Sequence, residues 1–330
     1  MKIVRLIFLI IHIGIFFLLV GMLLNTYVPP KVFPWFNLIS LGFPVLMTGY
    51  IVLTVFWVFC WKKRAVVFLL LGLMFFNATI RWINYTPEKK DVADLKIVSF
   101  NTKDGQISGK KDLEDYLNSQ HADVMFLQEE SGYQINFKGY TKGGVKSLTT
   151  LFTKHEIIDE KLIDPDTESI ASYGTQTDIK IRGRIYRFIN VYLHPFKFKK
   201  SMVKLNGNSD QDEKKIKNII GKLIPTFKLH QEEVAAIRKA VENSPYPVIM
   251  AGDFNSVPNS YEYYHLSEDL KDAFMETGKG SATSFHDYKF PIRIDYVFSS
   301  KSIQPISYKV DRSVRISDHF PVIATFKLEH

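Results

Sequence analysis

One stretch decides the fold of this chain: Val248-Ile249-Met250-Ala251-Gly252-Asp253-Phe254-Asn255. Its apolar and small residues predict a buried strand. Gly252 is followed by the acid Asp253 and, two positions after that, by the amide Asn255. Asp253 and Asn255 therefore lie on one side of a strand end, as an acceptor and a donor suited to a water molecule and a phosphate oxygen. Gly, Asp and Asn are also the ordinary residues of turns, so this stretch alone is equally consistent with a simple strand-to-loop turn.

The same pattern recurs in the rest of the C-terminal part, where several predicted buried strands end in a carboxylate, an amide or an imidazole. The polar residues at these ends are Asn101, Glu129, Asp253, Asn255, Asp295, Asp318 and His319. Each has an ordinary explanation by itself, such as a satisfied core carboxylate for Asp295 or an exposed turn for Asp318. Strand ends collected at one edge of a sheet would bring all of them into a single cleft.

Of the net charge of +8, all but one unit lies in the N-terminal part. Residues 1–91 hold nine Lys or Arg and two acidic residues, whereas residues 92–330 hold 33 basic and 32 acidic residues. The basic charge therefore flanks apolar segments and does not form a DNA-binding surface. Cys60 is the only cysteine, which excludes an intrachain disulfide and a thiolate metal cluster. Any metal would be bound by oxygen or imidazole ligands.

Three apolar runs precede residue 85, at residues 6–24, 36–61 and 65–80. The first is close to the roughly 20 residues that cross a bilayer core, and no small-residue cleavage site follows it, so we expect it to be retained. Lys and Arg at residues 2, 5 and 62–64 predict cytoplasmic ends there. We therefore expect a multi-pass protein of the cytoplasmic membrane whose C-terminal domain is extracytoplasmic. A re-entrant third run would reverse this topology.

The predicted organisation is a membrane region at 1–85 with about three transmembrane helices, a linker at 86–95 and a catalytic domain at 96–330. Residues 177–181 and 185–193 predict a hairpin. Residues 212–243 have a helical pattern that Pro225 interrupts. Residues 196–222 contain eight lysines among apolar positions, which fits either a solvated face or a lip that meets an anionic membrane or substrate.

From about residue 95 to 328 the chain resembles the endonuclease/exonuclease/phosphatase superfamily, which is deoxyribonuclease I-like. The motifs that carry the resemblance are Phe100-Asn101, Leu127-Gln128-Glu129, Gly252-Asp253-Phe254-Asn255, Arg293-Ile294-Asp295-Tyr296 and Ser317-Asp318-His319-Phe320-Pro321. The chain is also similar to the membrane-tethered bacterial branch. The resemblance implies an α/β fold, a four-layered α/β/β/α sandwich preceded by an N-terminal transmembrane helical region.

The resemblance also implies a hydrolase of phosphodiester or phosphomonoester bonds that uses Mg²⁺ or Mn²⁺. A hard cation on oxygen ligands neutralises the ester's charge and polarises its P–O bond. Glu129 is the expected metal ligand, supported by Asn101 and Asp318. Asp253 would orient and deprotonate the attacking water while Asn255 holds a phosphate oxygen. His319, oriented by Asp295, would act as acid/base partner or phosphate clamp, and which of Asp253 and His319 takes the proton stays open.

The family places a histidine or a tyrosine facing the phosphate after the hairpin strand. Here the segment is Asn190-Val191-Tyr192-Leu193-His194-Pro195, so either Tyr192 or His194 is the expected phosphate contact. The predicted substrate is a lipid head group or nucleic acid, and an endonuclease acting on external nucleic acid is the alternative. A catalytically silent, membrane-tethered binding module is the alternative from another class. Nothing in the sequence identifies a protein partner.

Overall fold

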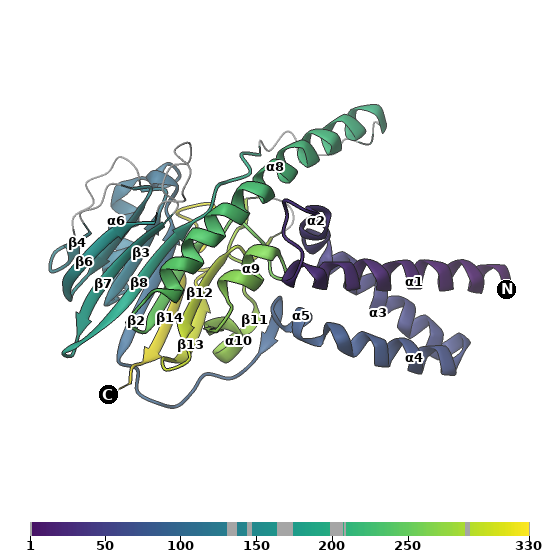
Figure 1. Ribbon diagram of the computed structural model, residues 1–330, viewed down its shortest axis with the longest axis horizontal. Helices are drawn as coiled ribbons and strands as arrows, with labels where there is room; N and C mark the ends of the chain where they lie inside the picture. Colours follow the sequence, from purple (N-terminus) through teal and green to yellow (C-terminus); the bar gives the residue numbers. More distant parts are fainter. Residues whose placement is uncertain are drawn as a thin grey trace.

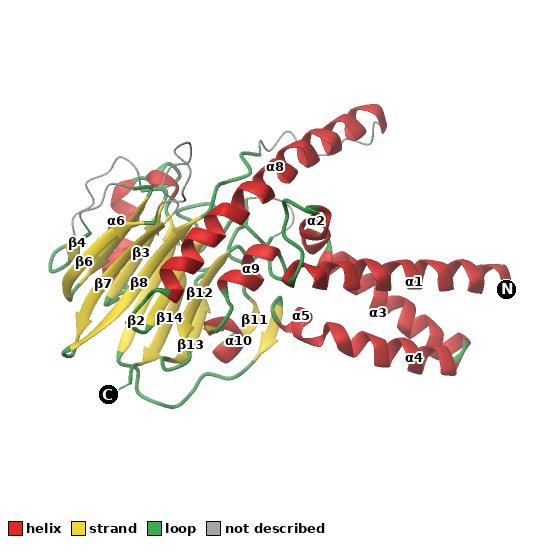
Figure 2. Ribbon diagram, viewed as in Figure 1, coloured by secondary structure: helices red, strands yellow, loops and turns green. Residues whose placement is uncertain are grey.

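The structure is a computed structural model that describes residues 2–130, 137–143, 147–163, 174–198, 207, 209–287 and 291–329. A bundle of helices at the N-terminal end adjoins a sandwich of β-sheets flanked by helices (Figure 1). Helices dominate the first part and strands the second (Figure 2). We call residues 2–85 the N-terminal region and the remainder the sandwich.

Two six-stranded sheets form the sandwich. In the first sheet the strands lie in the order β13 (Gln304–Val310), β14 (Val322–Lys327), β2 (Leu95–Asn101), β3 (Val124–Gln128), β5 (Thr149–Thr153) and β4 (Thr141–Lys142). In the second sheet the order is β10 (Leu270–Asp272), β12 (Asp295–Ser300), β9 (Val248–Asp253), β8 (Arg184–Tyr192), β7 (Gly174–Ile181) and β6 (Glu156–Leu162). Strands β7 and β8 pair antiparallel as the predicted hairpin. Sequence patterns did not predict strands β4, β5, β6 and β10 of these sheets.

Three apolar layers hold the sandwich together. The two sheets pack through residues such as Phe126 and Phe188. Helix α6 (Lys110–Ser119) packs on the first sheet through Leu113 and Leu117, while α8 (Ser209–Glu242) packs on the second. The order helix, sheet, sheet, helix confirms the predicted four-layered α/β/β/α sandwich.

Helix α8 continues through Pro225, where the sequence predicted an interruption. A proline removes one helical hydrogen bond and crowds the preceding turn, but a helix supported by tertiary packing can continue past it. The C-terminal half of α8 lies on the sheet, and the N-terminal half projects past the sandwich, above α2 in this view (Figure 1). Smaller elements complete the sandwich: η3 (Lys103–Gly105), α9 (Tyr261–Leu266), α10 (Ala273–Thr277) and β11 (Lys279–Ser281).

The N-terminal region contains α1 (Lys2–Leu23), η1 (Leu24–Thr26), α2 (Trp35–Leu41), α3 (Phe43–Cys60), α4 (Lys62–Gly72), η2 (Leu73–Phe75), α5 (Phe76–Ile80) and β1 (Ile83–Tyr85). Three stretches are long and apolar enough to cross a membrane: Lys2–Thr26, Phe43–Cys60 and Lys62–Ile80. This is consistent with the predicted membrane association. The second apolar run is split at Gly42, so that α2 is a separate short helix beside the sandwich.

A buried polar network joins the N-terminal region to the sandwich. Asn37 of α2 donates to both carboxylate oxygens of Glu262 (3.0 and 2.8 Å) and accepts from the backbone N–H of Tyr261 (2.7 Å). Glu262 is also 2.7 Å from Nδ1 of His230 on α8. The other ring nitrogen of His230 lies 2.7 Å from the carbonyl oxygen of His194. The network thus connects α2 to the segment that leaves strand β8.

Candidate active site

Strand register brings three of the expected side chains together in the second sheet. Asp253 ends β9 and is directly opposite Asp295, the first residue of β12. On the other side of β9, Tyr192 at the end of β8 is opposite the same Asp253. Three neighbouring strands therefore present a polar side chain at one edge of this sheet.

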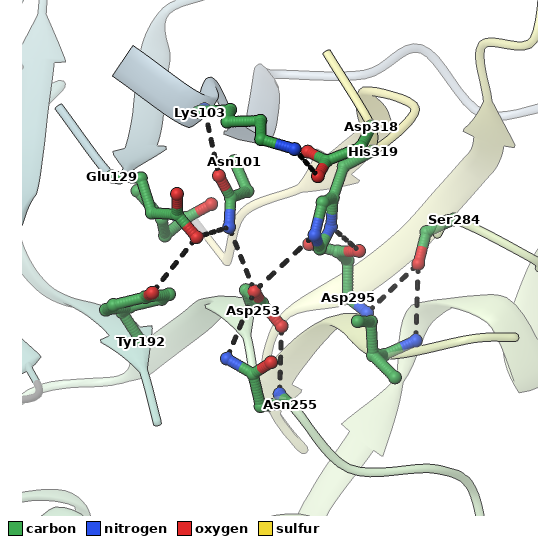
Figure 3. Close-up of polar contacts among 12 residues, drawn as sticks. Asn101, Lys103, Glu129, Tyr192, Asp253, Asn255, Ser284, Asp295, Asp318 and His319 are labelled. Carbon is green, nitrogen blue, oxygen red and sulfur yellow. Dashed lines mark hydrogen bonds and ion pairs between the residues drawn. The ribbon is translucent and has the colours of Figure 1, made fainter. Parts of the chain in front are cut away.

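The first sheet adds two more groups at the same place. Asn101 ends β2, and Glu129 follows β3, which runs parallel to β2. The amide Nδ2 of Asn101 donates to Glu129 Oε1 and to Asp253 Oδ2, both at 3.0 Å. This side chain bridges the two sheets, as Figure 3 shows.

The backbone at these strand ends is unusual. Glu129 and Asn255 have positive φ angles of 52° and 45°, which non-glycine residues seldom adopt outside special sites. Gly252 has φ 148°, and a Cβ there would lie 1.9 Å from the carbonyl oxygen of Val191. The glycine therefore permits the close approach of β8 and β9 that aligns Tyr192 with Asp253.

Asp253, Asp295 and His319 form the buried centre of the site. Nδ1 of His319 lies 2.8 Å from Asp295 Oδ2, and Nε2 lies 3.7 Å from Asp253 Oδ2. The hydroxyl oxygen of Ser284 accepts from the backbone N–H groups of Ile294 and Asp295 (3.2 and 3.1 Å) and so fixes the start of β12. The second carboxylate oxygen of Asp295 has no hydrogen-bond partner among the described residues.

Burial and neighbouring charges shift the pKa values of His319 and Asp253 in opposite directions. Burial alone would lower the pKa of His319, but the carboxylates of Asp295 and Asp253 outweigh it and raise that pKa to about 10. Burial raises the pKa of Asp253 to about 7, against the effect of His319. The imidazole is therefore a proton donor at neutral pH, while Asp253 can accept a proton there.

Asn255 supports Asp253 from the following turn. Its backbone N–H donates to Asp253 Oδ1 at 2.8 Å. Its side-chain amide donates to the carbonyl oxygen of Leu193 (2.8 Å) and more loosely to Asp253 Oδ2 (3.3 Å). The longer of these contacts can be exchanged for a ligand oxygen with little loss.

The two alternatives Tyr192 and His194 are in different surroundings. The hydroxyl of Tyr192 donates to Glu129 Oε1 at 3.0 Å. Strand β8 ends at Tyr192, so the alternation that would place His194 on the same face stops there. The backbone N–H of His194 donates to Glu233 (3.1 Å), and its carbonyl oxygen faces His230. Of the two residues, Tyr192 is the one that contacts the Glu129 carboxylate.

Asp318 is paired with a residue that sequence reasoning missed. The ammonium of Lys103 donates to Asp318 (Figure 3). Burial would lower the pKa of Lys103, but Asp318, Asp287 and Glu129 together raise it. Lys103 lies two positions after Asn101 in the turn that leaves β2, and this proximity was the available signal. Ser284, the other missed residue, has no recognisable sequence signal.

Some of these groups line a cavity with a volume of about 470 Å³. Glu129, Asp253, Asn255, Asp318 and His319 form part of its wall. Carboxylate and amide oxygens are the donors that Mg²⁺ and Mn²⁺ prefer. The ammonium of Lys103 among three carboxylates shows that this corner of the cavity favours a positive charge. The residues present therefore fit a hard divalent cation.

A second possible cation site overlaps the first. Asp253, Asp295 and His319 each offer one ligand atom, and these atoms lie within 4.8 Å of one another. However, Asp295 already pairs with Nδ1 of His319. The predicted ligands are engaged as well, since Asp318 pairs with Lys103, and Asn101 Oδ1 accepts from the backbone N–H of Lys103 at 3.0 Å. Glu129, Asn101 and Asp318 stay the ligands that the sequence predicts.

A model of the Endonuclease/Exonuclease/phosphatase family matches residues 98–319. A second model, a domain of unknown function, matches residues 5–82. The chain matches no curated protein sequence.

Solved structures share the fold of the sandwich. An endonuclease/exonuclease/phosphatase from Bacteroides vulgatus has 17% identity and a TM-score of 0.51, covering 71% of this chain and 99% of that chain. A family protein from Leptotrichia buccalis C-1013-b has 15% identity and a TM-score of 0.51, covering 71% and 100%. An AP endonuclease from Archaeoglobus fulgidus has 18% identity and a TM-score of 0.50, covering 71% and 100%. At these identities the likeness shows the fold alone.

Proposed function

Because the chain belongs to the Endonuclease/Exonuclease/phosphatase family, we propose that it is a membrane-anchored, divalent-metal-dependent hydrolase of phosphoester bonds. One observation carries the proposal. Asp253, His319 and Glu129 line one cavity, and Asn101 and Asp295 hydrogen-bond to Asp253 and His319 from behind, although the five residues come from separate strand ends or turns. A binding module would not need a histidine held between two carboxylates inside such a cavity.

Glu129, Asn101 and Asp318 would hold a Mg²⁺ or Mn²⁺ ion. When bound, the ion would neutralise the phosphate and polarise its P–O bond. Tyr192 and Asn101 would keep the Glu129 carboxylate oriented through their hydrogen bonds. Lys103 would withdraw from Asp318 or bind the phosphate itself.

Asp253 would accept the proton of the attacking water. Its carboxylate is buried, and it is oriented by Asn101 and by the backbone of Asn255. His319, charged and held by Asp295, would donate to a phosphate oxygen or to the departing oxygen. The water oxygen bonds to phosphorus as the ester P–O bond breaks, and the departing oxygen leaves with a proton as an alcohol.

A panel of phosphoesters tests the proposal with purified full-length protein in detergent. The panel comprises bis(p-nitrophenyl) phosphate, plasmid DNA, abasic DNA, sphingomyelin and phosphatidylinositol, each with Mg²⁺, with Mn²⁺ and with EDTA. We expect hydrolysis of at least one ester, its loss in EDTA and its recovery on adding the metal. No hydrolysis under any condition would favour the silent binding module, and cleavage restricted to DNA would favour the endonuclease.

We also propose that the N-terminal region spans the cytoplasmic membrane and places the sandwich outside. The three apolar helical stretches and the lysines and arginines at their ends support this topology. Fused after Asp91, a reporter that works only outside the cytoplasm should be active, and a reporter that works only in the cytoplasm should be inactive. A reporter active only in the cytoplasm would show that one of the three stretches does not cross.

A further inference from the structure

The cavity that contains the candidate catalytic groups has a second, apolar half. Beyond the carboxylates its wall is formed by residues that include Leu41, Phe196, Ile219, Leu223, Phe285 and Ile292. Apolar surface gains free energy from apolar ligand groups such as acyl chains, and a small hydrophilic phosphoester would leave this wall without a partner.

Leu41 connects the apolar wall of the cavity to the N-terminal region. It is the last residue of α2 in the N-terminal region, and α3, the second candidate span, begins at Phe43. Leu41 and Trp82 pack against the apolar cluster of Val257, Phe285 and Ile294 at the cavity. The apolar half is thus continuous with the N-terminal region and lies at the end of a candidate membrane span.

The N-terminal region is fixed to the sandwich beside this cavity. Asn259 accepts from Arg81 (3.0 Å), donates to the carbonyl oxygen of Ala78 (3.1 Å) and accepts at its own carbonyl from Asn25 (3.0 Å). Arg293 of the sandwich donates to the carbonyl oxygen of Arg81 at 3.1 Å. Together with the Asn37–Glu262 contacts, these bonds hold the cavity close to the ends of all three spans.

Helix α8 forms the opposite side. Its projecting half carries apolar residues at helical spacing, and Ile219 and Leu223 among them line the cavity. Lysines such as Lys214 and Lys217 are exposed on the same half. This pattern is typical of a helix that lies at a lipid surface, with its basic side chains among anionic head groups. The part of the lysine-rich segment at 199–206 and 208 lies outside the described residues.

We infer that the substrate is an amphiphilic phosphoester of the bilayer, a phospholipid or sphingolipid, with its phosphate at Asp253 and its apolar chains against Leu41 and Leu223. This inference rests on the proposed function and names its substrate class. Water and a lipid phosphodiester give a phosphomonoester and an alcohol. The water oxygen and one proton stay on phosphorus, and the other proton goes to the departing oxygen.

Full-length protein in mixed micelles tests the inference. Dioleoyl phosphatidylglycerol, phosphatidylinositol and sphingomyelin are compared with their chain-free phosphodiesters, with duplex and single-stranded DNA, and with bis(p-nitrophenyl) phosphate. For at least one lipid we expect kcat/KM at least about 100-fold above that of its chain-free counterpart, because several methylene groups gain contact with the wall. Leu41→Asn should reduce this ratio about 10-fold. Val45→Asn, which changes an exposed residue of α3 outside the cavity, should leave the ratio unchanged.

The outcomes separate the two proposals. Equal kcat/KM for lipid and chain-free ester, or a preference for DNA, would overturn the inference and leave the proposed function intact. Loss of hydrolysis of every ester, the small diester included, would overturn both. If Leu41→Asn does not fold, Leu41→Ala serves in its place. An unchanged ratio in a folded Leu41 variant would also contradict the inference.

Discussion

The protein contains two buried histidine–carboxylate pairs of nearly equal geometry. His319 and Asp295 are 2.8 Å apart in the candidate active site, and His230 and Glu262 are 2.7 Å apart beside α2. All four side chains are almost completely buried. Their chemistry differs because their remaining atoms meet different neighbours.

Each remaining polar atom of the His230–Glu262 pair has a protein partner. The second ring nitrogen of His230 faces the carbonyl oxygen of His194, and both oxygens of Glu262 accept from Asn37. By contrast, His319 Nε2 faces the carboxylate of Asp253 at 3.7 Å, and one oxygen of Asp295 has no described hydrogen-bond partner. We call His230–Glu262 the closed pair and His319–Asp295 the open pair. A pair whose polar atoms all have partners stabilises the junction between two regions, whereas a pair with free polar atoms beside a cavity can exchange protons with a substrate.

Substitution of Asp253, the carboxylate that faces His319 of the open pair, should cause the largest loss of turnover. Asp253→Asn should lower turnover of a small phosphodiester by about 10⁴-fold or more, because it removes the proton acceptor and the group that orients the water. The midpoint of thermal unfolding should not fall, since the substitution also removes a charge that burial disfavours. Turnover within tenfold of the wild-type value would contradict this role.

The open pair should behave as one unit. Asp295→Asn and His319→Ala should each lower turnover by about 10²- to 10⁴-fold, and the double variant should lose little more than the worse single variant. Steady-state kinetics of the three variants form a double-mutant cycle. Multiplicative losses would show that the two residues act independently.

The closed pair should show the opposite response. Glu262→Gln or His230→Gln should lower the free energy of unfolding by about 3–5 kcal/mol, because the remaining partner is left buried without its counter-charge. Turnover per folded molecule should change much less than in the His319 variant. Chemical unfolding in detergent followed by tryptophan fluorescence measures the first effect. A stable Glu262→Gln protein without activity would erase the distinction between the pairs.

A smaller effect is the pH dependence of stability at the closed pair. Burial would lower the pKa of His230, but Glu262 outweighs it and raises that pKa above 6.5; the charge of His230 likewise lowers the pKa of Glu262 below 4.5 against burial. The contribution of His230 is therefore complete below pH 6.5 and is lost as pH rises through its raised pKa. That of Glu262 is present above pH 4.5 and is lost as pH falls through its lowered pKa.

Thermal unfolding across this pH range should thus show an excess stability of wild type over Glu262→Gln that is greatest between pH 4.5 and 6.5. The same excess at pH 9 as at pH 5.5 would contradict the charged state assigned to this pair.

The residues of the open pair could be predicted from the sequence, whereas those of the closed pair could not. Asp253, Asp295 and Glu129 each follow or begin a short buried run, and this local pattern is legible without knowing the sheet order. The contact between Asn37 and Glu262 joins residues 225 positions apart in segments with no common pattern. The same is true of Leu41 at the cavity, because the apolar run that predicted a membrane span concealed the break at Gly42.

Other differences depended on where an element ends. Strand β8 stops at Tyr192, and that single boundary separates the surroundings of Tyr192 from those of His194. Helix α8 continues through Pro225, where propensity alone predicted a break, and Leu223 and Phe227 on either side of the proline are buried. The fold class followed from the family resemblance that the strand-end motifs carry, but the neighbours of each site residue required the structure.

We propose that the cavity beside the His319–Asp295 pair binds a divalent metal for phosphoester hydrolysis. Calorimetric titration of Mn²⁺ into full-length wild-type protein, Glu129→Gln and Glu130→Gln tests it most directly. Glu130 is the matched control, since it is the next residue, is buried and pairs with Lys142. We expect Glu129→Gln to weaken Mn²⁺ binding at least about 10-fold and Glu130→Gln to bind Mn²⁺ as wild type does. Equal Mn²⁺ affinity in wild type and a folded Glu129→Gln protein would contradict it.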